Sequence, residues 1–262
     1  MTGSHPRHLY VANVLKKAGL LQGLIIEERE DFVPQCPEDL DGIDRDNFIR
    51  HFIDRDSAEN NFFGKEIIKE SFDTVPVLRV RQEELNSLKV IDWITKLNPD
   101  QLLSYGVHKL SSQIIDICPD YAWNIHGGLS PWYRGSVTLF WPFYFMKPNW
   151  AGMTIHKLSK LIDAGNIIHH SVPELKRGDG VHDVACRSVI QVADDLVKIL
   201  NLLCEGKEIM SVPQKSEGKL FLGSDWEPYH LRLIYQLFKN DLVDEFLDGN
   251  IKSLPPKLVR AF

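Results

Sequence analysis

Short apolar runs alternate with stretches of helical spacing through the middle of the chain. A β-branched run at 75–80 precedes helical spacing over 86–96, and a second run-and-helix pair leads to a third apolar run at 122–125. Strands that alternate with helices pair in parallel, and the helices cover the sheet. The sequence therefore predicts an α/β fold, a Rossmann-like and mostly parallel sheet with helices on both faces.

The two ends of the chain are expected to complete this core and to add to it. Thr2 and Gly3 stand directly before a helical pattern. This position is typical of the turn between the first strand and the first helix of such a sheet. Residues 181–204 form a long amphipathic helical pattern, after which the elements become shorter. We expect a main domain over residues 1–205 and a small C-terminal subdomain over residues 206–262.

The composition excludes several classes of partner. A net charge of −6 argues against a nucleic-acid partner, because phosphate backbones are bound by concentrated Lys and Arg side chains. No apolar run reaches the ~20 residues that a membrane-spanning helix needs, and the N-terminus lacks a secretory signal. The four cysteines are scattered without CxxC spacing, which is typical of free thiols in a reducing compartment. We expect a cytoplasmic protein without nucleic-acid or membrane partners.

A side-chain amide and an imidazole stand two residues apart at Asn124 and His126, at the end of an apolar run. Because strand side chains repeat with period two, both lie on one face of the predicted strand. An amide can stabilise an oxyanion while a neighbouring imidazole moves protons, and the carboxylate of Asp163 can orient the imidazole. Taken alone, the histidine is more often an interior residue and the aspartate a turn former.

Four ordered segments resemble the formyltransferase family that uses 10-formyltetrahydrofolate. The family pattern is Asn-x-His, Leu-x-Pro-x-Tyr-Arg-Gly, Thr-Gly-x-Thr-x-His and Asp-x-Gly. This chain matches the pattern at residues 124–126, 129–135, 151–156 and 163–165. Ala151 stands where the third segment of the pattern has its first threonine. Purine and tRNA formyltransferases usually carry Pro-Ser where this chain has two glycines at 127–128. The departure makes the sugar N-formyltransferases the most similar members.

The resemblance implies an N-formyltransferase that moves a formyl group from 10-formyltetrahydrofolate to the amine of a nucleotide-linked amino sugar in polysaccharide biosynthesis. The main domain would be catalytic, the protein would form a homodimer, and no metal would be needed. Asp163 would hold the imidazole and favour its protonated form. The residues implied are Asn124, His126 and Asp163 for catalysis, Ser104, Tyr105, Gly106 and Ile162 for the folate, and Arg7, Gly127, Gly128 and Trp132 for the acceptor.

Two other functions remain open. An enzyme like methionyl-tRNA formyltransferase is disfavoured by the acidic charge and by the absence of a basic C-terminal domain. A catalytically silent folate- or nucleotide-binding protein is disfavoured by the intact Asn124, His126 and Asp163. A metal site that includes His156 is disfavoured too, because the histidines lack the short i,i+4 spacing of HExxH.

Overall fold

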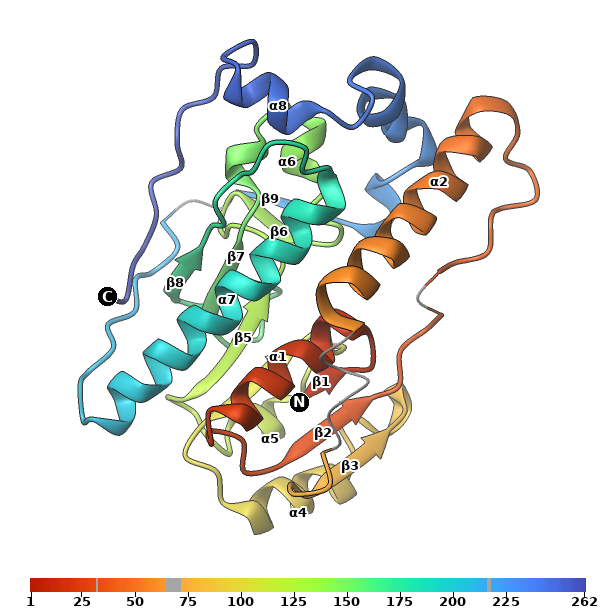
Figure 1. The fold of residues 1–262 in the computed structure, drawn as a ribbon. Helices are drawn as coiled ribbons and strands as arrows, with labels where there is room; N and C mark the ends of the chain where they lie inside the picture. Colours follow the sequence, from red (N-terminus) through yellow and green to blue (C-terminus); the bar gives the residue numbers. More distant parts are fainter. Residues whose placement is uncertain (32, 65–71, 216–217) are drawn as a thin grey trace.

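A seven-stranded sheet forms the centre of the protein in the computed structural model, which describes residues 1–31, 33–64, 72–215 and 218–262 (Figure 1). Its strand order is β3-β2-β1-β4-β5-β7-β8. Neighbours from β3 to β5 pair in parallel, whereas β7 pairs antiparallel with both β5 and β8. The strands are β1 (Thr2–Gly3), β2 (Leu24–Glu27), β3 (Val77–Val80), β4 (Leu102–Tyr105), β5 (Ala122–His126), β7 (Met153–Lys157) and β8 (Ile167–Ser171).

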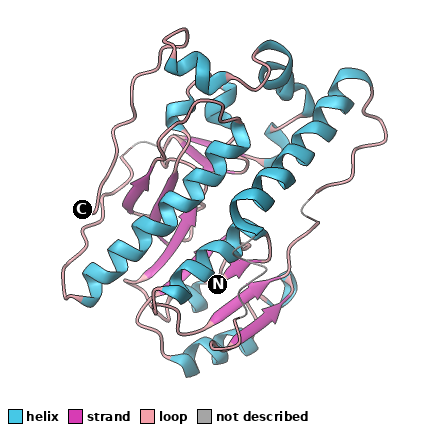
Figure 2. Ribbon diagram, viewed as in Figure 1, coloured by secondary structure: helices cyan, strands magenta, loops and turns pink. Residues whose placement is uncertain are grey.

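Helices cover both faces of this sheet (Figure 2). On one face α1 (Pro6–Lys17) and α7 (Val181–Cys204) pack together, and α2 (Gly42–Glu59) packs on α7. On the other face α4 (Leu88–Leu97) and α5 (Ser112–Ile115) bury their apolar side chains. The predicted Rossmann-like α/β sheet is confirmed.

The remaining helices are short. They are α6 (Trp141–Tyr144) and α8 (Leu242–Leu247), the 3-10 helices Gln82–Glu84, Pro148–Trp150, Gly223–Asp225 and Pro228–His230, and the π-helices Asn60–Gly64 and Leu233–Leu237. Among the described residues, none of the helices combines the length and apolarity needed to cross a bilayer.

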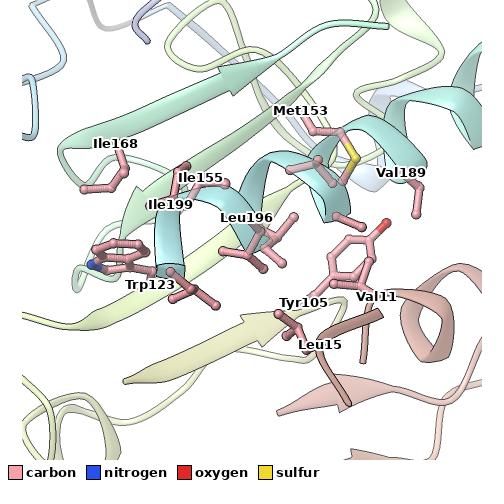
Figure 3. Packing of buried hydrophobic residues seen from close by; sticks show 14 of the residues in the cluster. Val11, Leu15, Tyr105, Trp123, Met153, Ile155, Ile168, Val189, Leu196 and Ile199 are labelled. Atoms are coloured by element: carbon pink, nitrogen blue, oxygen red, sulfur yellow. The ribbon is translucent and has the colours of Figure 1, made fainter. Parts of the chain in front are cut away.

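The largest stripe of apolar side chains belongs to α7, whose bounds match the predicted amphipathic pattern at 181–204. Residues on one side of an α-helix recur every three or four positions, so this helix presents a continuous apolar face to the sheet. Figure 3 shows side chains of this face together with side chains from β5, β7 and β8. The buried partners are Val189, Leu196 and Ile199 of the helix and Trp123, Ile155 and Ile168 of the strands.

The prediction of a turn at Thr2 and Gly3 is wrong, because these residues form strand β1. Thr2 pairs with Ile26 on one side and with Tyr105 on the other. β1 therefore lies inside the sheet, although it has only two residues.

The C-terminal segment packs closely against the rest of the protein. Its strand β9 (Lys219–Phe221) pairs with β6 (Tyr133–Gly135) in a second, two-stranded sheet. Leu231 and Val243 share an apolar cluster with Leu129. The division at residue 206 stays a prediction.

The last residues of the chain lie along β8. The N–H of His170 donates to the Val259 carbonyl over 2.9 Å, and the N–H of Val259 donates to the His170 Nδ1 over 3.0 Å. Ile167, on the same strand, exchanges two backbone hydrogen bonds with Val212. Segments from outside the seven strands therefore cover the outer edge of the sheet.

Candidate active site

Asn124, His126 and Asp163 meet at the carboxyl end of β5. The Asn124 Nδ2 lies 3.5 Å from one carboxylate oxygen of Asp163, and the His126 Nδ1 lies 3.3 Å from the other. Asn124 and His126 share one face of the strand, as the period of two predicts. His126 is 6% exposed, so its imidazole is shielded from most water.

Asp163 reaches this position from the turn between β7 and β8. Its backbone has φ +47°, in the left-handed region that aspartate tolerates better than most residues. The side-chain amide of Gln214 donates to the carbonyls of Asp163 and Gly165, each over 2.8 Å. The N–H of Gly135 donates to the Asp163 carboxylate over 2.9 Å. The carboxylate is therefore held from several sides.

Hydrogen bonds fix the orientation of the Asn124 amide. Its Oδ1 accepts a hydrogen bond from the Ser104 hydroxyl over 2.8 Å, and its Nδ2 lies 3.2 Å from the His156 Nε2. The His156 Nδ1 lies 2.8 Å from the Lys157 carbonyl, which assigns a ring proton to Nδ1. Asn124 therefore directs its N–H groups toward Asp163 and His156.

The surroundings of His126 determine its protonation. Its Nε2 lies 2.8 Å from the Tyr133 carbonyl, so a neutral ring carries its proton there and turns the Nδ1 lone pair toward Asp163. Burial lowers the pKa of the imidazole, and Asp163 acts in the opposite direction. Asp163 does favour the protonated ring, as expected, but burial has the larger effect. The imidazole is neutral at pH 7.

The Asp163 carboxyl is ionised at the same pH. Burial alone would raise its pKa, but His126, His156 and the N–H of Gly135 together lower the pKa to about 2. The site therefore combines an anionic carboxylate, a neutral imidazole and an amide with a fixed donor direction. Such a set can accept a proton and stabilise the imidazolium that results.

The residues predicted to line a folate pocket lie at the end of β4. Ser104 is buried, and its hydroxyl donates to the Asn124 Oδ1. Tyr105 is also buried, and its ring meets that of His8 edge-on at 4.7 Å. Gly106 has φ +65°, and a Cβ there would overlap the His8 ring. The parallel register places Ser104 beside Asn124, and contact of Ser104, Tyr105 and Gly106 with a folate stays a prediction.

The loop before Asp163 presents apolar side chains to solvent. Ile162 is 53% exposed and Leu161 is 73% exposed, directly before the buried carboxylate. Exposed apolar side chains that stand together can mark a binding surface. Contact of Ile162 with a folate stays a prediction.

The predicted acceptor residues lie in different surroundings. The Arg7 guanidinium pairs with the Glu59 carboxylate at 2.7 Å. Trp132 packs edge-on against Trp150 at 5.1 Å, inside the cluster shared with the C-terminal segment. Gly127 is half-buried beside His126. Contact of these residues with an acceptor stays a prediction.

Gly128 allows the close packing around His126. A Cβ at this position would lie 2.6 Å from the Tyr133 carbonyl oxygen and 2.8 Å from the His126 Nε2. Both distances are shorter than van der Waals contact. Glycine at 128 therefore lets the Tyr133 carbonyl reach the imidazole.

Sequence reasoning missed His156 as a member of this group. The antiparallel register of β5 and β7 pairs His156 with Asn124, and its Nε2 lies 3.5 Å from Asp163. The signal was its position two residues after Thr154, which puts both side chains on one face of β7. Across residues 1–31, 33–64, 72–215 and 218–262, no group of His, Cys, Asp and Glu side chains is placed to hold a metal ion.

Comparison with known proteins shows one family. The sequence model described as formyl transferase matches residues 53–196. Among solved structures, the formyltransferase PseJ from Anoxybacillus kamchatkensis, in complex with UDP-4,6-dideoxy-4-formamido-L-AltNAc and tetrahydrofolate, has a TM-score of 0.52 at 20% identity, over 84% of this chain and 95% of its own.

Two further solved structures have the same fold. Phosphoribosylglycinamide formyltransferase from Anaplasma phagocytophilum has a TM-score of 0.54 at 16% identity, over 84% of this chain and 94% of its own. Glycinamide ribonucleotide transformylase 1 from Symbiobacterium toebii has a TM-score of 0.52 at 18% identity, over 82% and 92%.

Proposed function

This chain belongs to the formyl transferase family, and on that premise we propose that it moves a formyl group from 10-formyltetrahydrofolate to the amine of a nucleotide-linked amino sugar. The convergence of Asn124, His126 and Asp163 carries the proposal. The proposal includes a role in polysaccharide biosynthesis and a homodimeric assembly, as the family resemblance implies.

The donor is supported by the loop that ends at Asp163. Leu161 and Ile162 offer exposed apolar surface for one side of a pterin, next to the polar floor of the site. The similar structure from Anoxybacillus kamchatkensis holds tetrahydrofolate. When bound, the formylated folate supplies the carbonyl carbon and a nitrogen leaving group.

Asn124 is the residue that stabilises the oxyanion in this proposal. Attack of an amine on the formyl carbon leaves negative charge on the carbonyl oxygen, and a fixed N–H donor lowers the energy of that state. Ser104 and His156 hold the Asn124 amide so that Nδ2 is the group available. Nδ2 lies 3.2 Å from the His156 Nε2 and 3.5 Å from Asp163, so the N–H on the longer contact, to Asp163, is the one that turns to the oxyanion.

His126 is the proton acceptor in this proposal. Its Nδ1 lone pair takes the proton that the attacking amine loses, and the imidazolium then donates to both the Tyr133 carbonyl and the Asp163 carboxylate. A neutral imidazole at pH 7 is ready to act as a base, and the adjacent carboxylate stabilises the charge that forms. His126 then returns the proton to the departing nitrogen of the folate.

The acceptor is supported by charge and by the glycines after His126. A net charge of −6 is unfavourable for tRNA, whose recognition needs concentrated positive charge. Gly127 and Gly128 replace the Pro-Ser typical of purine and tRNA enzymes, next to the imidazole. The similar PseJ structure holds a UDP-linked formamido sugar.

Mass spectrometry of reaction mixtures tests the proposal. The purified protein is incubated with 10-formyltetrahydrofolate and each of a panel of nucleotide-linked amino sugars, and the products are analysed. We expect at least one sugar to gain one formyl group, and the product to disappear with Asn124→Ala and with His126→Ala.

Controls separate the alternatives. Formylation of methionyl-tRNA but of no sugar would overturn the proposed acceptor. Binding of folate, seen as a raised Tm, without formyl transfer to any sugar or tRNA would instead identify a silent binding protein.

A further inference from the structure

Arg134 lies between two backbone groups that contact the proposed catalytic side chains. Its neighbours in β6 make these contacts. The Tyr133 carbonyl lies 2.8 Å from the His126 Nε2, and the N–H of Gly135 donates to the Asp163 carboxylate over 2.9 Å. The backbone of Arg134 is therefore fixed beside the proposed site.

The side chain of Arg134 is directed away from the apolar cluster that β6 joins. Successive side chains of a strand point to opposite faces, so Arg134 and Tyr133 lie on opposite faces of β6. Tyr133 is buried, and its ring stacks on that of Phe221 at 5.9 Å. Leu220, the register partner of Arg134 on β9, shares the Arg134 face and is 39% exposed. Arg134 therefore projects from the more accessible face of the two-stranded sheet.

The Arg134 guanidinium lacks a partner within the part of the chain that the structure describes. Its Nε is buried without a hydrogen bond to any described residue, and no described carboxylate forms an ion pair with the side chain. Arg187 and Arg29, which are half-buried like Arg134, pair with carboxylates at 2.8 and 3.0 Å. A cation that is partly removed from water is stabilised by an anion, and no described residue supplies one to Arg134.

The charge of Arg134 acts on the imidazole of His126. Burial is the largest cause that lowers the pKa of His126, and Arg134 lowers this pKa further. The guanidinium therefore lies near the reacting groups. Arg134 also belongs to the segment 127–135, which contains the predicted acceptor residues Gly127, Gly128 and Trp132.

A nucleotide-linked sugar carries the anion that Arg134 lacks. Its phosphate groups are attached directly to the sugar, and the planar fork of an arginine matches phosphate oxygens with two parallel hydrogen bonds. A net charge of −6 disfavours general attraction of such a molecule, so a cation placed at the site is needed to bind it.

We propose that Arg134 binds a phosphate of the nucleotide-linked acceptor and so determines the preference of the site for that class of substrate. The identity of the acceptor rests on the proposed function.

Calorimetric titration tests this proposal without catalysis. The probes are UDP, GDP, CDP, ADP and dTDP, and the proteins are the wild type, Arg134→Gln, Arg134→Lys and Arg79→Gln. Arg79 is the matched control, because it is an exposed arginine on β3, at the far edge of the sheet from β8.

We expect at least one diphosphate to bind to the wild type, and its Kd to rise by about tenfold or more in Arg134→Gln, because charge-assisted hydrogen bonds are lost. Arg134→Lys keeps the charge without the planar fork, so its Kd should lie between the two. The Kd of Arg79→Gln should stay within about twofold of wild type, because exposed charges contribute little. The affinity of Arg134→Gln for tetrahydrofolate should not change.

Three results would overturn the proposal. The first is that the wild type binds none of these diphosphates, and the second is that the wild type and Arg134→Gln bind them with equal Kd. The third is that Arg134→Gln weakens only the binding of tetrahydrofolate, which would place a folate carboxylate at Arg134. Thermal unfolding shows whether each variant is folded. If Arg134→Gln is not, Arg134→Lys is compared with the wild type, and equal Kd values for these two would overturn the proposal.

Kinetics separate this proposal from the proposed function. With an accepted sugar, Arg134→Gln should raise KM by about tenfold or more while kcat stays within about threefold of wild type, because the phosphate is bound in both the ground state and the transition state. Formyl transfer with an unchanged KM in Arg134→Gln would contradict only the role of Arg134. Binding of a diphosphate through Arg134 without formyl transfer to any sugar would contradict only the proposed function.

Discussion

Replacement of Asp163 by asparagine removes the charge at the centre of the proposed site and keeps its shape. Asparagine also tolerates the left-handed backbone that Asp163 adopts, and its side-chain oxygen can still accept from the N–H of Gly135. The variant is therefore expected to fold. What it lacks is the anion 3.3 Å from the His126 Nδ1.

The distance sets the size of the effect. Two unit charges at this separation attract by about 5 kcal/mol at an effective dielectric constant of about 20. The Asp163 side chain is 11% exposed, so solvent screens part of this attraction, and we expect the imidazolium to lose about 2 to 4 kcal/mol of stabilisation. If that charge is present in the transition state, kcat falls by about 30- to 1000-fold.

Steady-state formyl transfer with the accepted sugar measures the loss, and thermal unfolding confirms that the variant is folded. Asp120→Asn is the matched control, because it removes the same charge from an exposed pair with Lys157. We expect the control to keep wild-type kcat. A kcat for Asp163→Asn within about threefold of wild type, with the same pH profile, would refute the assignment of Asp163 as the group that stabilises the imidazolium.

Further predictions concern the supporting residues. Ser104→Ala should lower kcat by about 5- to 100-fold with little change in folate binding, because the Asn124 amide loses a buried hydrogen bond of about 1–3 kcal/mol. An unchanged kcat would show that Ser104 does not support the Asn124 amide. Gly128→Ala should lower the free energy of unfolding, measured in urea, by about 1–3 kcal/mol. Gly127→Ala should not, because a Cβ at this position would meet only ordinary contacts at 3.7 Å. Equal effects of the two substitutions would contradict the close packing described at Gly128. Burial lowers the pKa of His170 to about 4, so the neutral ring contributes fully to the free energy of unfolding above pH 6.5, and this contribution is lost as the pH falls toward 4. Over this range the free energy of unfolding of the wild type should fall by about 3 kcal/mol more than that of His170→Gln. Equal pH dependence of the unfolding free energy in the two proteins would exclude the effect.

The parts of the fold that sequence predicts well are those with long periodic patterns. The helix at 181–204 has the bounds that its apolar spacing indicates, because many turns report the same face. The strand that contains Asn124 and His126 is also predicted, because it follows several strands that alternate with helices along the chain. For this strand and for the helix at 181–204, the local sequence pattern agrees with the tertiary structure.

Contacts between distant segments were not predictable in the same way. His156 joins the site through the antiparallel register of β5 and β7, and no local pattern specifies which strand lies beside which. Arg7 and Glu59 are separated by fifty-two residues and pair because α1 and α2 both pack on α7. The resemblance to a family supplied the chemistry of the site, but the hydrogen bonds that orient it came from the structure.

The cover over β8 affects how copies of this protein can associate. A bare edge strand offers a row of backbone donors and acceptors to any other strand, which promotes aggregation. Here Val212 and Val259 occupy that edge through backbone contacts with Ile167 and His170. Two copies therefore cannot join their large sheets edge to edge at β8 while the tail is in place. Loss of the residues after 254 would uncover the part of this edge at His170, whereas Val212 would still cover Ile167.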